Sequence, residues 1–444
     1  MMPAVQMPPT WQRVLTTGMT EYSLVDWLAR LETLHPKEIE LGLERVAVVA
    51  NRLQLLPVAV PVITVAGTNG KGSVVGAVEA LVTHKGLRAG VCTSPHLLRF
   101  NERIRVAGED ASDADIVAAF AEIEAARGEV SLTYFEFATL AALLVFRQQA
   151  VDIVVLEVGL GGRLDAVNIV DPSVAVITSI ALDHEAWLGN NLDGIAREKA
   201  GILRRSTPAV IACTDVPEGL REAVVESGAE AYWFGQCFGA AVAEPAAPAW
   251  ISASSGERRT LPSLQNPALL EQNLLAAVQA LECVGVAVAS SEASSVLPTL
   301  QIAGRRQQRA LGALQVVLDV AHNPAAVVKL VEFLQQNPAE KRTIAVFSAM
   351  ADKDIPSMVR LIAGSVDAWF LADQPGNART IKAASIAECL RAEGQGMISV
   401  SRNLRQALAR ARSVASVGDR LLVFGSFHTV AAAMAWLARE QGKA

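Results

Sequence analysis

A glycine-rich cluster with one lysine and one serine is the first candidate for chemistry. It reads Gly67-Thr-Asn-Gly-Lys71-Gly-Ser73 and follows a β-branched run. Backbone N–H groups in such a turn, a helix start and a lysine all favour an anion, and a serine hydroxyl can bind Mg²⁺. The match to the P-loop pattern is imperfect, because Val65 stands where the first glycine belongs and Gly72 separates the lysine from the serine. The cluster predicts phosphate binding; the alternative is a tight strand-to-helix turn with a solvated lysine.

A second glycine cluster, Glu157-Val-Gly-Leu-Gly-Gly-Arg-Leu-Asp165, follows an apolar strand pattern. It is not a dinucleotide fingerprint, because its third glycine directly follows the second and Asp171-Pro172 comes too early for a crossover helix. We expect a loop whose backbone approaches a ligand, with plain turn chemistry as the alternative. Glu157, at the carboxyl end of its strand, is a candidate metal ligand, although exposed strand-end carboxylates are common.

Polar residues also follow the next predicted strand, where Asp183-His184-Glu185 stands. Ligands in open α/β sheets bind at the carboxyl ends of strands. His184 could bind a metal, act as a base or satisfy a carbonyl, and Mg²⁺ usually prefers oxygen ligands. Lys199 lies among charges that normally mark a solvated helix face.

The second half of the chain repeats the arrangement of strand ends and helix starts. Asp319 and His322 precede Asn323-Pro324, a natural helix start, and could contact a nucleotide or only cap the helix. Arg305 lies at the predicted hinge, where it could reach phosphate across a cleft or remain a solvated linker residue. Ser426 opens a third helix start, for which capping is the expected role.

The elements that position these residues alternate between short β-branched runs and longer helical patterns, which predicts a mostly parallel sheet covered by helices. Residues 239–262 break the rhythm and predict a loop or small β excursion, and residues 290–295 predict a turn. Strands are expected at 62–66, 89–93, 153–158, 174–179 and 209–212, and helices at 72–85, 113–126, 135–149 and 269–284.

The alternation restarts near Gly304. Strands are expected at 314–319, 343–347, 368–371 and 420–424, and helices at 325–335, 355–363, 404–411 and 429–439. We therefore expect an α/β protein with two domains, a P-loop domain over residues 1–303 and a smaller Rossmann-like domain over residues 304–444. Two tandem α/β domains predict a site in the cleft between them.

Composition limits the class of protein. The 444 residues include 39 Lys and Arg against 45 Asp and Glu, a net charge of −6, with 51% hydrophobic and 19% charged residues, so a compact protein without a basic nucleic-acid surface is expected. Five scattered cysteines without a CxxC pair favour a reducing cytoplasm, and no targeting or membrane segment is expected.

Taken together, the motifs resemble the folylpolyglutamate synthase family, relatives of the peptidoglycan Mur ligases, from about residue 23 to residue 429. The family's own P-loop has the Gly-Lys-Gly-Ser order, which accounts for the imperfect match. The matching segments are Gly67–Ser73, Thr93-Ser-Pro-His96 with Asn101-Glu-Arg103, Tyr134–Phe137, Glu157–Asp165, Asp183-His184, Glu198-Lys-Ala-Gly201 and Asp319–Pro324.

The resemblance implies ATP-dependent amide formation, in which a substrate carboxylate takes the γ-phosphoryl group and the amine of glutamate then displaces phosphate. It implies Lys71, Lys199 and His184 as catalytic residues, with Lys199 carbamylated into an anionic metal bridge. The implied ligands of two Mg²⁺ ions are Ser73, Ser94, Glu157 and His184. Contacts with ATP are implied for Gly67, Thr68, Asn69, Gly70, Lys71, Gly72, Ser73, Asn273, Arg305, Asp319 and His322.

Some family members only extend folate tails, whereas bifunctional members also add the first glutamate to dihydropteroate. The segments 27–45 and 183–189 resemble the bifunctional kind, although Glu40 stands where Asp is usual. Tyr134 and Phe135 offer planar surfaces for a pterin ring, or are only core aromatics at a helix start. The implied substrate pocket comprises Glu40, Leu41, Gly42, Thr133, Tyr134, Phe135, Glu136, Leu164, Asp165 and Ala166.

The expected partners are small molecules, namely dihydropteroate, reduced folates and L-glutamate, for a cytoplasmic monomer that binds neither nucleic acid nor membrane. Lys353, Ser426 and His428 lie on the expected glutamate side of the cleft. Three rival functions stay open: a ligase for a nucleotide-linked cell-wall precursor, an ATP-dependent switch, and a nicotinamide-dependent oxidoreductase. The first would need a further N-terminal domain, and the third rests only on the glycines near residues 159–162 and 425.

Overall fold

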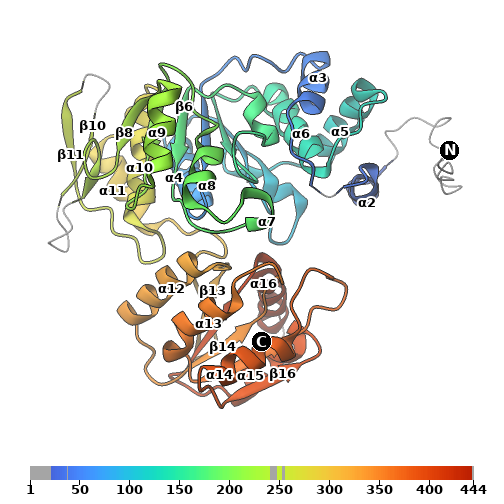
Figure 1. Cartoon of the computed structure of the whole chain (residues 1–444), viewed down its shortest axis with the longest axis vertical. Helices are drawn as coiled ribbons and strands as arrows, with labels where there is room; N and C mark the ends of the chain where they lie inside the picture. Colours follow the sequence, from blue (N-terminus) through green and yellow to red (C-terminus); the bar gives the residue numbers. More distant parts are fainter. Residues whose placement is uncertain (1–21, 38, 241–247, 253–255, 443–444) are drawn as a thin grey trace, which may run out of the picture.

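Two α/β parts lie one above the other in the computed structural model (Figure 1). The structure describes residues 22–37, 39–240, 248–252 and 256–442. Residues 1–21, in which the sequence predicts no targeting signal, lie outside this range. No helix in the described part of the chain is long and apolar enough to cross a membrane.

The first part is built on an eight-stranded sheet with β1 near its centre. Strands β2, β5, β1, β6, β7 and β8 are neighbours in this order and run parallel. Strands β3 and β4 pair antiparallel beside β2 and form one edge. The central strands are buried on both faces, as their continuous Val and Ile runs require. The order is β4 (Glu109–Asp110), β3 (Ile104–Val106), β2 (Ala89–Cys92), β5 (Ile153–Glu157), β1 (Val62–Ala66), β6 (Val174–Ile177), β7 (Pro208–Ile211) and β8 (Glu230–Trp233).

Helices cover both faces of this sheet. One face carries α2 (Leu24–Leu34), α3 (Glu44–Arg52), α5 (Asp113–Arg127), α6 (Tyr134–Gln148), α8 (Leu192–Ala200) and α9 (Glu218–Ser227), with the short α7 (Glu185–Leu188) beside α8. The other carries α4 (Lys71–His84), α10 (Glu271–Cys283) and α11 (Ser290–Val296), with a small sheet of β9 (Gly239–Ala240), β10 (Ala249–Ser252) and β11 (Arg258–Leu261) against α10.

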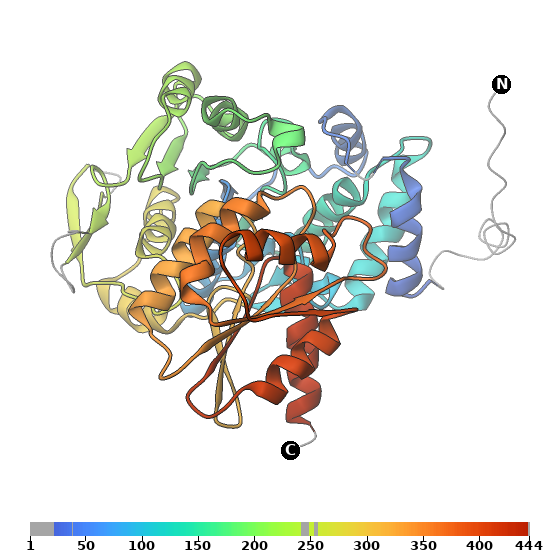
Figure 2. The same cartoon turned by 60° about the horizontal axis from the view of Figure 1, so that its bottom comes forward.

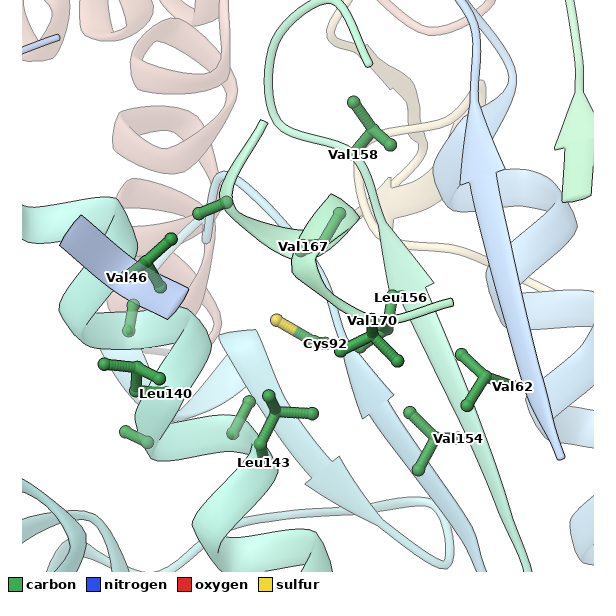
Figure 3. Packing of buried hydrophobic residues seen from close by; sticks show 14 of the residues in the cluster. Val46, Val62, Cys92, Leu140, Leu143, Val154, Leu156, Val158, Val167 and Val170 are labelled. Atoms are coloured by element: carbon green, nitrogen blue, oxygen red, sulfur yellow. The ribbon is translucent and has the colours of Figure 1, made fainter. Parts of the chain in front are cut away.

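The first core layer joins α6 to the strands beneath it. Figure 3 shows Leu143 of α6 pointing toward Cys92 of β2, with Leu140 one turn away along the helix and Val154 and Leu156 of β5 on the other side of Cys92. These side chains are at most 4% exposed. Their burial fixes the sheet against the helix and so fixes the strand ends that carry the polar residues.

The second part is a six-stranded sheet with one antiparallel edge strand. Its helices α12 (Pro324–Gln336), α13 (Ile355–Ile362) and α14 (Ala383–Ala392) cover one face, and α15 (Leu404–Val414) and α16 (Phe427–Gln441) cover the other (Figure 2). The order is β12 (Gln307–Leu311), β13 (Leu314–Asp319), β17 (Arg420–Phe424), β14 (Thr343–Phe347), β15 (Ala368–Ala372) and β16 (Ile398–Ser401), parallel apart from β12.

The predicted α/β class with mostly parallel sheets is confirmed, and the predicted boundary between residues 303 and 304 stays a prediction. The turn predicted at residues 290–295 is wrong, because the segment forms α11. Glu292 accepts a hydrogen bond from the N–H of Ala289 and pairs at 2.7 Å with Lys85, the residue after α4. A cap and a tertiary ion pair thus stabilise a serine-rich helix. The small β excursion within residues 239–262 is confirmed as β9–β11.

Replacing Leu140 by alanine should lower the free energy of unfolding by about 2–5 kcal/mol, because the buried side chain leaves a cavity in the layer of Figure 3. Denaturant unfolding followed by circular dichroism measures the change. The matched control is Val225→Ala on the surface of α9, where the side chain is 80% exposed and the change should stay within about 0.5 kcal/mol. Equal effects of the two variants would contradict the packing described here.

Candidate active site

The turn between β1 and α4 is shaped as a cradle for an anion. Gly70 begins α4 with φ of 92°, and a Cβ there would lie 2.8 Å from the side-chain nitrogen of Asn273. Only glycine therefore allows α10 to approach the loop this closely. The Nζ of Lys71 donates to the carbonyls of Gly67 at 2.9 Å and Thr68 at 3.3 Å. Lys71 thus lies over its own loop and burial lowers its pKa, which excludes the solvated-lysine alternative.

Two polar groups from neighbouring strand ends lie beside this turn. Glu157 ends β5 and is 4% exposed, so it is not an exposed strand-end carboxylate. Burial raises its pKa, and the nearby charges of Lys71 and Arg305 lower it. The N–H of Ser94, just after β2, donates to Glu157 Oε2 at 3.2 Å. A serine hydroxyl and a carboxylate are therefore next to each other at the edge of the turn.

His184 begins α7 with φ of 53°, a left-handed conformation that is uncommon for a residue with a side chain. It lines the same cavity as the glycine-rich turn. Burial lowers its pKa to about 4, because the charged imidazolium loses solvation. The ring is neutral near pH 7 and has a nitrogen lone pair for a metal ion.

Lys199 of α8 faces the same cavity and is 5% exposed, so the solvated helix face is excluded. Burial, followed by the charge of Lys71, lowers its pKa to about 7. The glycine loop after β5 brings α8 this close, because a Cβ on Gly162 would lie 2.8 Å from the carbonyl oxygens of Glu198 and Lys199. The sequence predicts that the backbone of this loop approaches a ligand; at Gly162 it approaches the backbone of α8 instead.

The second part contributes its strand ends from the opposite side. Arg305 lies with its Cζ 5.1 Å from the ring centre of Phe427, and its Nη1 is buried without a hydrogen-bond partner in the described part of the chain. Asp319 accepts from the N–H groups of Arg306 at 2.8 Å and Ala321 at 2.7 Å, so it braces the turn that presents Arg305. A buried guanidinium with an unused donor fits an anionic ligand.

The first cavity brings together every residue of the predicted nucleotide, metal and catalytic sets. Its lining includes Gly67, Thr68, Asn69, Gly70, Lys71, Gly72, Ser73, Ser94, Glu157, His184, Lys199, Asn273, Arg305, Asp319 and His322. Both α/β parts contribute, as the predicted cleft requires. Across the described ranges of the chain no group of three or more His, Cys, Asp or Glu side chains gathers as a metal site. A bound Mg²⁺ would thus need hydroxyl, phosphate or water oxygens besides Glu157 and His184.

A second cavity of about 930 Å³ adjoins the first, and the two share a wall at Ser94, Pro95, Gly159, Leu160 and His184. This volume suits a drug-sized aromatic ligand. Nine of the ten predicted substrate residues line it: Glu40, Leu41, Gly42, Thr133, Phe135, Glu136, Leu164, Asp165 and Ala166.

Tyr134 is the predicted substrate residue that does not line the second cavity. Neighbouring residues of a helix point about 100° apart, so Phe135 faces the cavity while Tyr134 faces away. Its ring centre lies 5.9 Å from that of Phe100, and the Cζ of Arg103 lies 5.5 Å above the ring. Tyr134 is therefore a packing residue of the helix start, which was the alternative reading of its position.

Two buried carboxyl groups, Asp165 and Glu136, line the second cavity, and Glu136 pairs with Arg45 at 3.1 Å. Asp165 accepts from the N–H of Leu160 at 2.8 Å and of Val167 at 3.1 Å. Burial nevertheless raises its pKa to about 6. Glu40, at the rim, is held by His35 at 2.6 Å, and this contact lowers its pKa. The cavity thus has two carboxyl groups inside and an ion-paired carboxylate at its edge.

Several residues of the site carry no local sequence signal. Arg306, Lys329 and Phe427 line the first cavity, and Asp352 and Arg379 line the second. They come from loops and helices of the second part, whose position relative to the first is set by long-range contacts. Ser426 accepts from the N–H of Thr429 at 3.1 Å and caps α16, as expected.

Lys71→Ala should weaken binding of a nucleoside triphosphate by about 10- to 100-fold, because one charge-assisted contact with phosphate is lost. Titration with a fluorescent ATP analogue measures the dissociation constant. Lys85→Ala is the matched control, since Lys85 pairs with Glu292 at the far end of α4 and lines none of the cavities described here. An affinity of Lys71→Ala within about threefold of the control would contradict the phosphate cradle.

Comparison with known proteins agrees with this geometry. The model of the Mur ligase middle domain matches residues 65–246, and that of the Mur ligase glutamate ligase domain matches residues 304–427. The dihydrofolate synthase/folylpolyglutamate synthase of Escherichia coli is 42% identical over 93% of this chain and 94% of its own length. That of Haemophilus influenzae is 37% identical over 92% and 96%.

Solved structures give the same result. The E. coli FolC complex with DHPP and ADP has a TM-score of 0.88 at 40% identity and covers 96% of this chain and 100% of its own. The Yersinia pestis bifunctional enzyme with AMPPNP and Mn has a TM-score of 0.87 at 40% identity, over 95% and 100%. These findings confirm the resemblance inferred from the motifs: the chain belongs to the folylpolyglutamate synthase family of the Mur ligases.

Proposed function

We propose that this chain is an ATP-dependent carbon–nitrogen ligase that adds L-glutamate to dihydropteroate and to the glutamate tail of reduced folates. The observation that carries the proposal is the wall shared by the two cavities. A ligand of the second cavity would reach the phosphate cradle across this wall, where Ser94 and His184 lie. A carboxylate at that wall would lie where a γ-phosphoryl group arrives.

ATP would lie with its phosphates against the backbone of the turn before α4, where the helix start favours negative charge. Lys71 would leave its loop carbonyls for the outer phosphates, and the free donor of Arg305 would bind them from the opposite side. Asn273 lies within the same lining. Phosphoryl transfer needs in-line positioning and charge neutralisation, which these groups provide.

Two Mg²⁺ ions would fit the donor set of the first cavity beside the shared wall. Ser73 and Ser94 offer hydroxyl oxygens, Glu157 a carboxylate and His184 a neutral nitrogen. When bound, Mg²⁺ neutralises phosphate oxygens and orients the transferring group. In the protein, Glu157 and Ser94 are already held together by their hydrogen bond, so part of the ligand set is organised in advance.

We propose that Lys199 is carbamylated. An amine reacts with CO₂ only when it is uncharged, and burial lowers the pKa of Lys199 to about 7, so a substantial fraction is neutral near pH 7. The carbamate replaces a buried cation by an anion next to Lys71. It would then bridge the cationic groups of the cavity.

Dihydropteroate would occupy the second cavity. Phe135 offers a flat face for the pterin, and Asp165 an oxygen for its ring N–H groups. The carboxylate of the ligand then takes the phosphoryl group, and the amine of glutamate attacks the acyl carbon and releases phosphate. Closeness of the two reactants supplies effective concentrations on the order of 10⁵–10⁸ M, and closure of the cleft between the two parts would exclude water.

The whole chain would act as a cytoplasmic monomer in folate synthesis and one-carbon metabolism, with the domain boundary at residues 303–304. Its five cysteines are free in the structure, as a reducing compartment requires. Sedimentation of the purified protein checks the monomer.

Glutamate-dependent ADP release should occur with both dihydropteroate and tetrahydrofolate as acceptor. A coupled assay with Mg²⁺-ATP measures both rates. Turnover with tetrahydrofolate alone would show a ligase that only extends folate tails. The inferred role of Glu40 and the rim of the second cavity in binding dihydropteroate would then be wrong. ATP hydrolysis that is indifferent to glutamate and to both acceptors would instead favour the nucleotide-dependent switch.

Lys199→Ala should lose at least about 90% of turnover, because the anionic bridge disappears while the fold is kept. Incubation of the purified wild-type protein with ¹³C-bicarbonate should give a carbamate resonance in the ¹³C NMR spectrum. Lys199→Ala should lack this resonance, and the control Lys85→Ala should retain it. Turnover of Lys199→Ala within a few-fold of the wild-type rate, or an unchanged resonance, would contradict the carbamate.

A further inference from the structure

A single buried carboxylate joins the two α/β parts. Asp183, in the loop after β6, accepts from Lys353 Nζ at 2.5 Å and from Asn323 Nδ2 at 2.9 Å, and the Nε2 of His322 lies 3.3 Å away. Its own loop adds the N–H of His184 at 2.8 Å. The first three donors all come from strand-end loops of the second part, after β13 and β14.

Asn323 links the same carboxylate to the phosphate cradle. Its side-chain nitrogen also donates to Asn69 Oδ1, and its oxygen accepts from Asn69 Nδ2, both at 3.1 Å. That oxygen also accepts from the N–H of Ala326 at 2.9 Å and so caps α12. All four hydrogen-bonding positions of Asn323 are used, which ties the cradle, Asp183 and the start of α12 into one network.

The ion pair of Asp183 and Lys353 is buried, with side-chain exposures of 5% and 6%. Desolvation largely cancels the attraction within such a pair, so the pair contributes little net stability. Its geometry is specific, however, because it joins the two parts, whereas the other ion pair of Lys353, with Asp352 at 3.2 Å, lies within the second part. We therefore expect this pair to affect the relative position of the two parts more than the free energy of unfolding.

The cavity beside this network is small. It measures about 190 Å³, below the roughly 300–1,000 Å³ that small-molecule sites usually have. Lys71 occupies part of the space by lying on its own loop. When Lys71 leaves its loop carbonyls, the space that opens lies between the cradle and the strand ends of the second part, so a bound nucleotide is enclosed by both parts.

We propose that Asp183 is a positioning residue that clasps the two α/β parts together over the nucleotide and must release Lys353 and Asn323 for nucleotide exchange. The clasp holds Arg305 and the loop of Lys353 opposite the cradle during ligation. Breaking it then has two effects of opposite sign: exchange becomes faster and ligation becomes slower. The ligation effect rests on the proposed function, whereas the exchange effect needs only nucleotide binding.

The test is the dissociation rate of a fluorescent ADP analogue, chased with unlabelled ADP in EDTA so that metal ligation by His184 plays no part. Asp183→Asn and Lys353→Met should each raise this rate by about 5- to 50-fold and lower glutamate-dependent turnover at least tenfold. Lys85→Met removes an ion pair of similar length within the first part and should change neither. The double variant should match the more affected single variant, because both remove one interaction.

Dissociation rates of both single variants within about twofold of Lys85→Met would overturn the clasp, as would slower dissociation. If Asp183→Asn fails to fold by circular dichroism, Lys353→Met alone decides, since its aliphatic stem is kept. Faster exchange in the variants of a protein that shows no ligase turnover would support the clasp and reject the proposed function. If the variants release nucleotide at the normal rate but turn over more slowly, the proposed ligase function stands and the clasp is rejected.

Discussion

Parallel strands place all their carboxyl ends at one edge of a sheet, and in this protein two such edges face each other. Every functional side chain described above depends on that arrangement. Ser94, Glu157 and His184 follow three strands of the first sheet, and Asp319 and Lys353 come at or after the ends of two strands of the second. Since the strands are fixed by apolar burial on both faces, the polar loops can be irregular without losing their positions.

Burial of charge is the second physical theme of the cleft. Lys71, Lys199 and His184 have pKa values lowered mainly by desolvation, whereas that of Glu157 is raised by the same cause. Each group is thus pushed toward its neutral form, and opposite charges nearby counteract the push. The balance keeps the imidazole of His184 neutral near pH 7 and lowers the pKa of the Lys199 amine to about 7.

The parts of the fold and site that are readable from sequence are those with a local cause. Buried central strands such as Val62–Ala66 appear as apolar runs, and the glycine-rich turn is identified by its residue types. Strands β3, β4, β8, β12 and β16, at or next to the edges of the two sheets, and helices α9 and α14 were not predicted, because their mixed patterns become ordered only through neighbouring elements. Tyr134 and Phe135 show the same limit, since helix direction separates two adjacent aromatics. The contact of Asp183 with Lys353 spans 170 positions, and no local pattern encodes it.

The wall at Ser94 and Pro95 has a consequence for inhibition. Because the two cavities share this wall, a single small molecule could carry an aromatic acid on one side and a phosphonate on the other. Such a bisubstrate compound would lose its translational freedom once while gaining the contacts of both ligands. The phosphate half would meet the glycine-rich turn with Lys71 and Arg305, whereas the aromatic half would meet the side chains of the second cavity such as Phe135, so the aromatic half can be varied by itself.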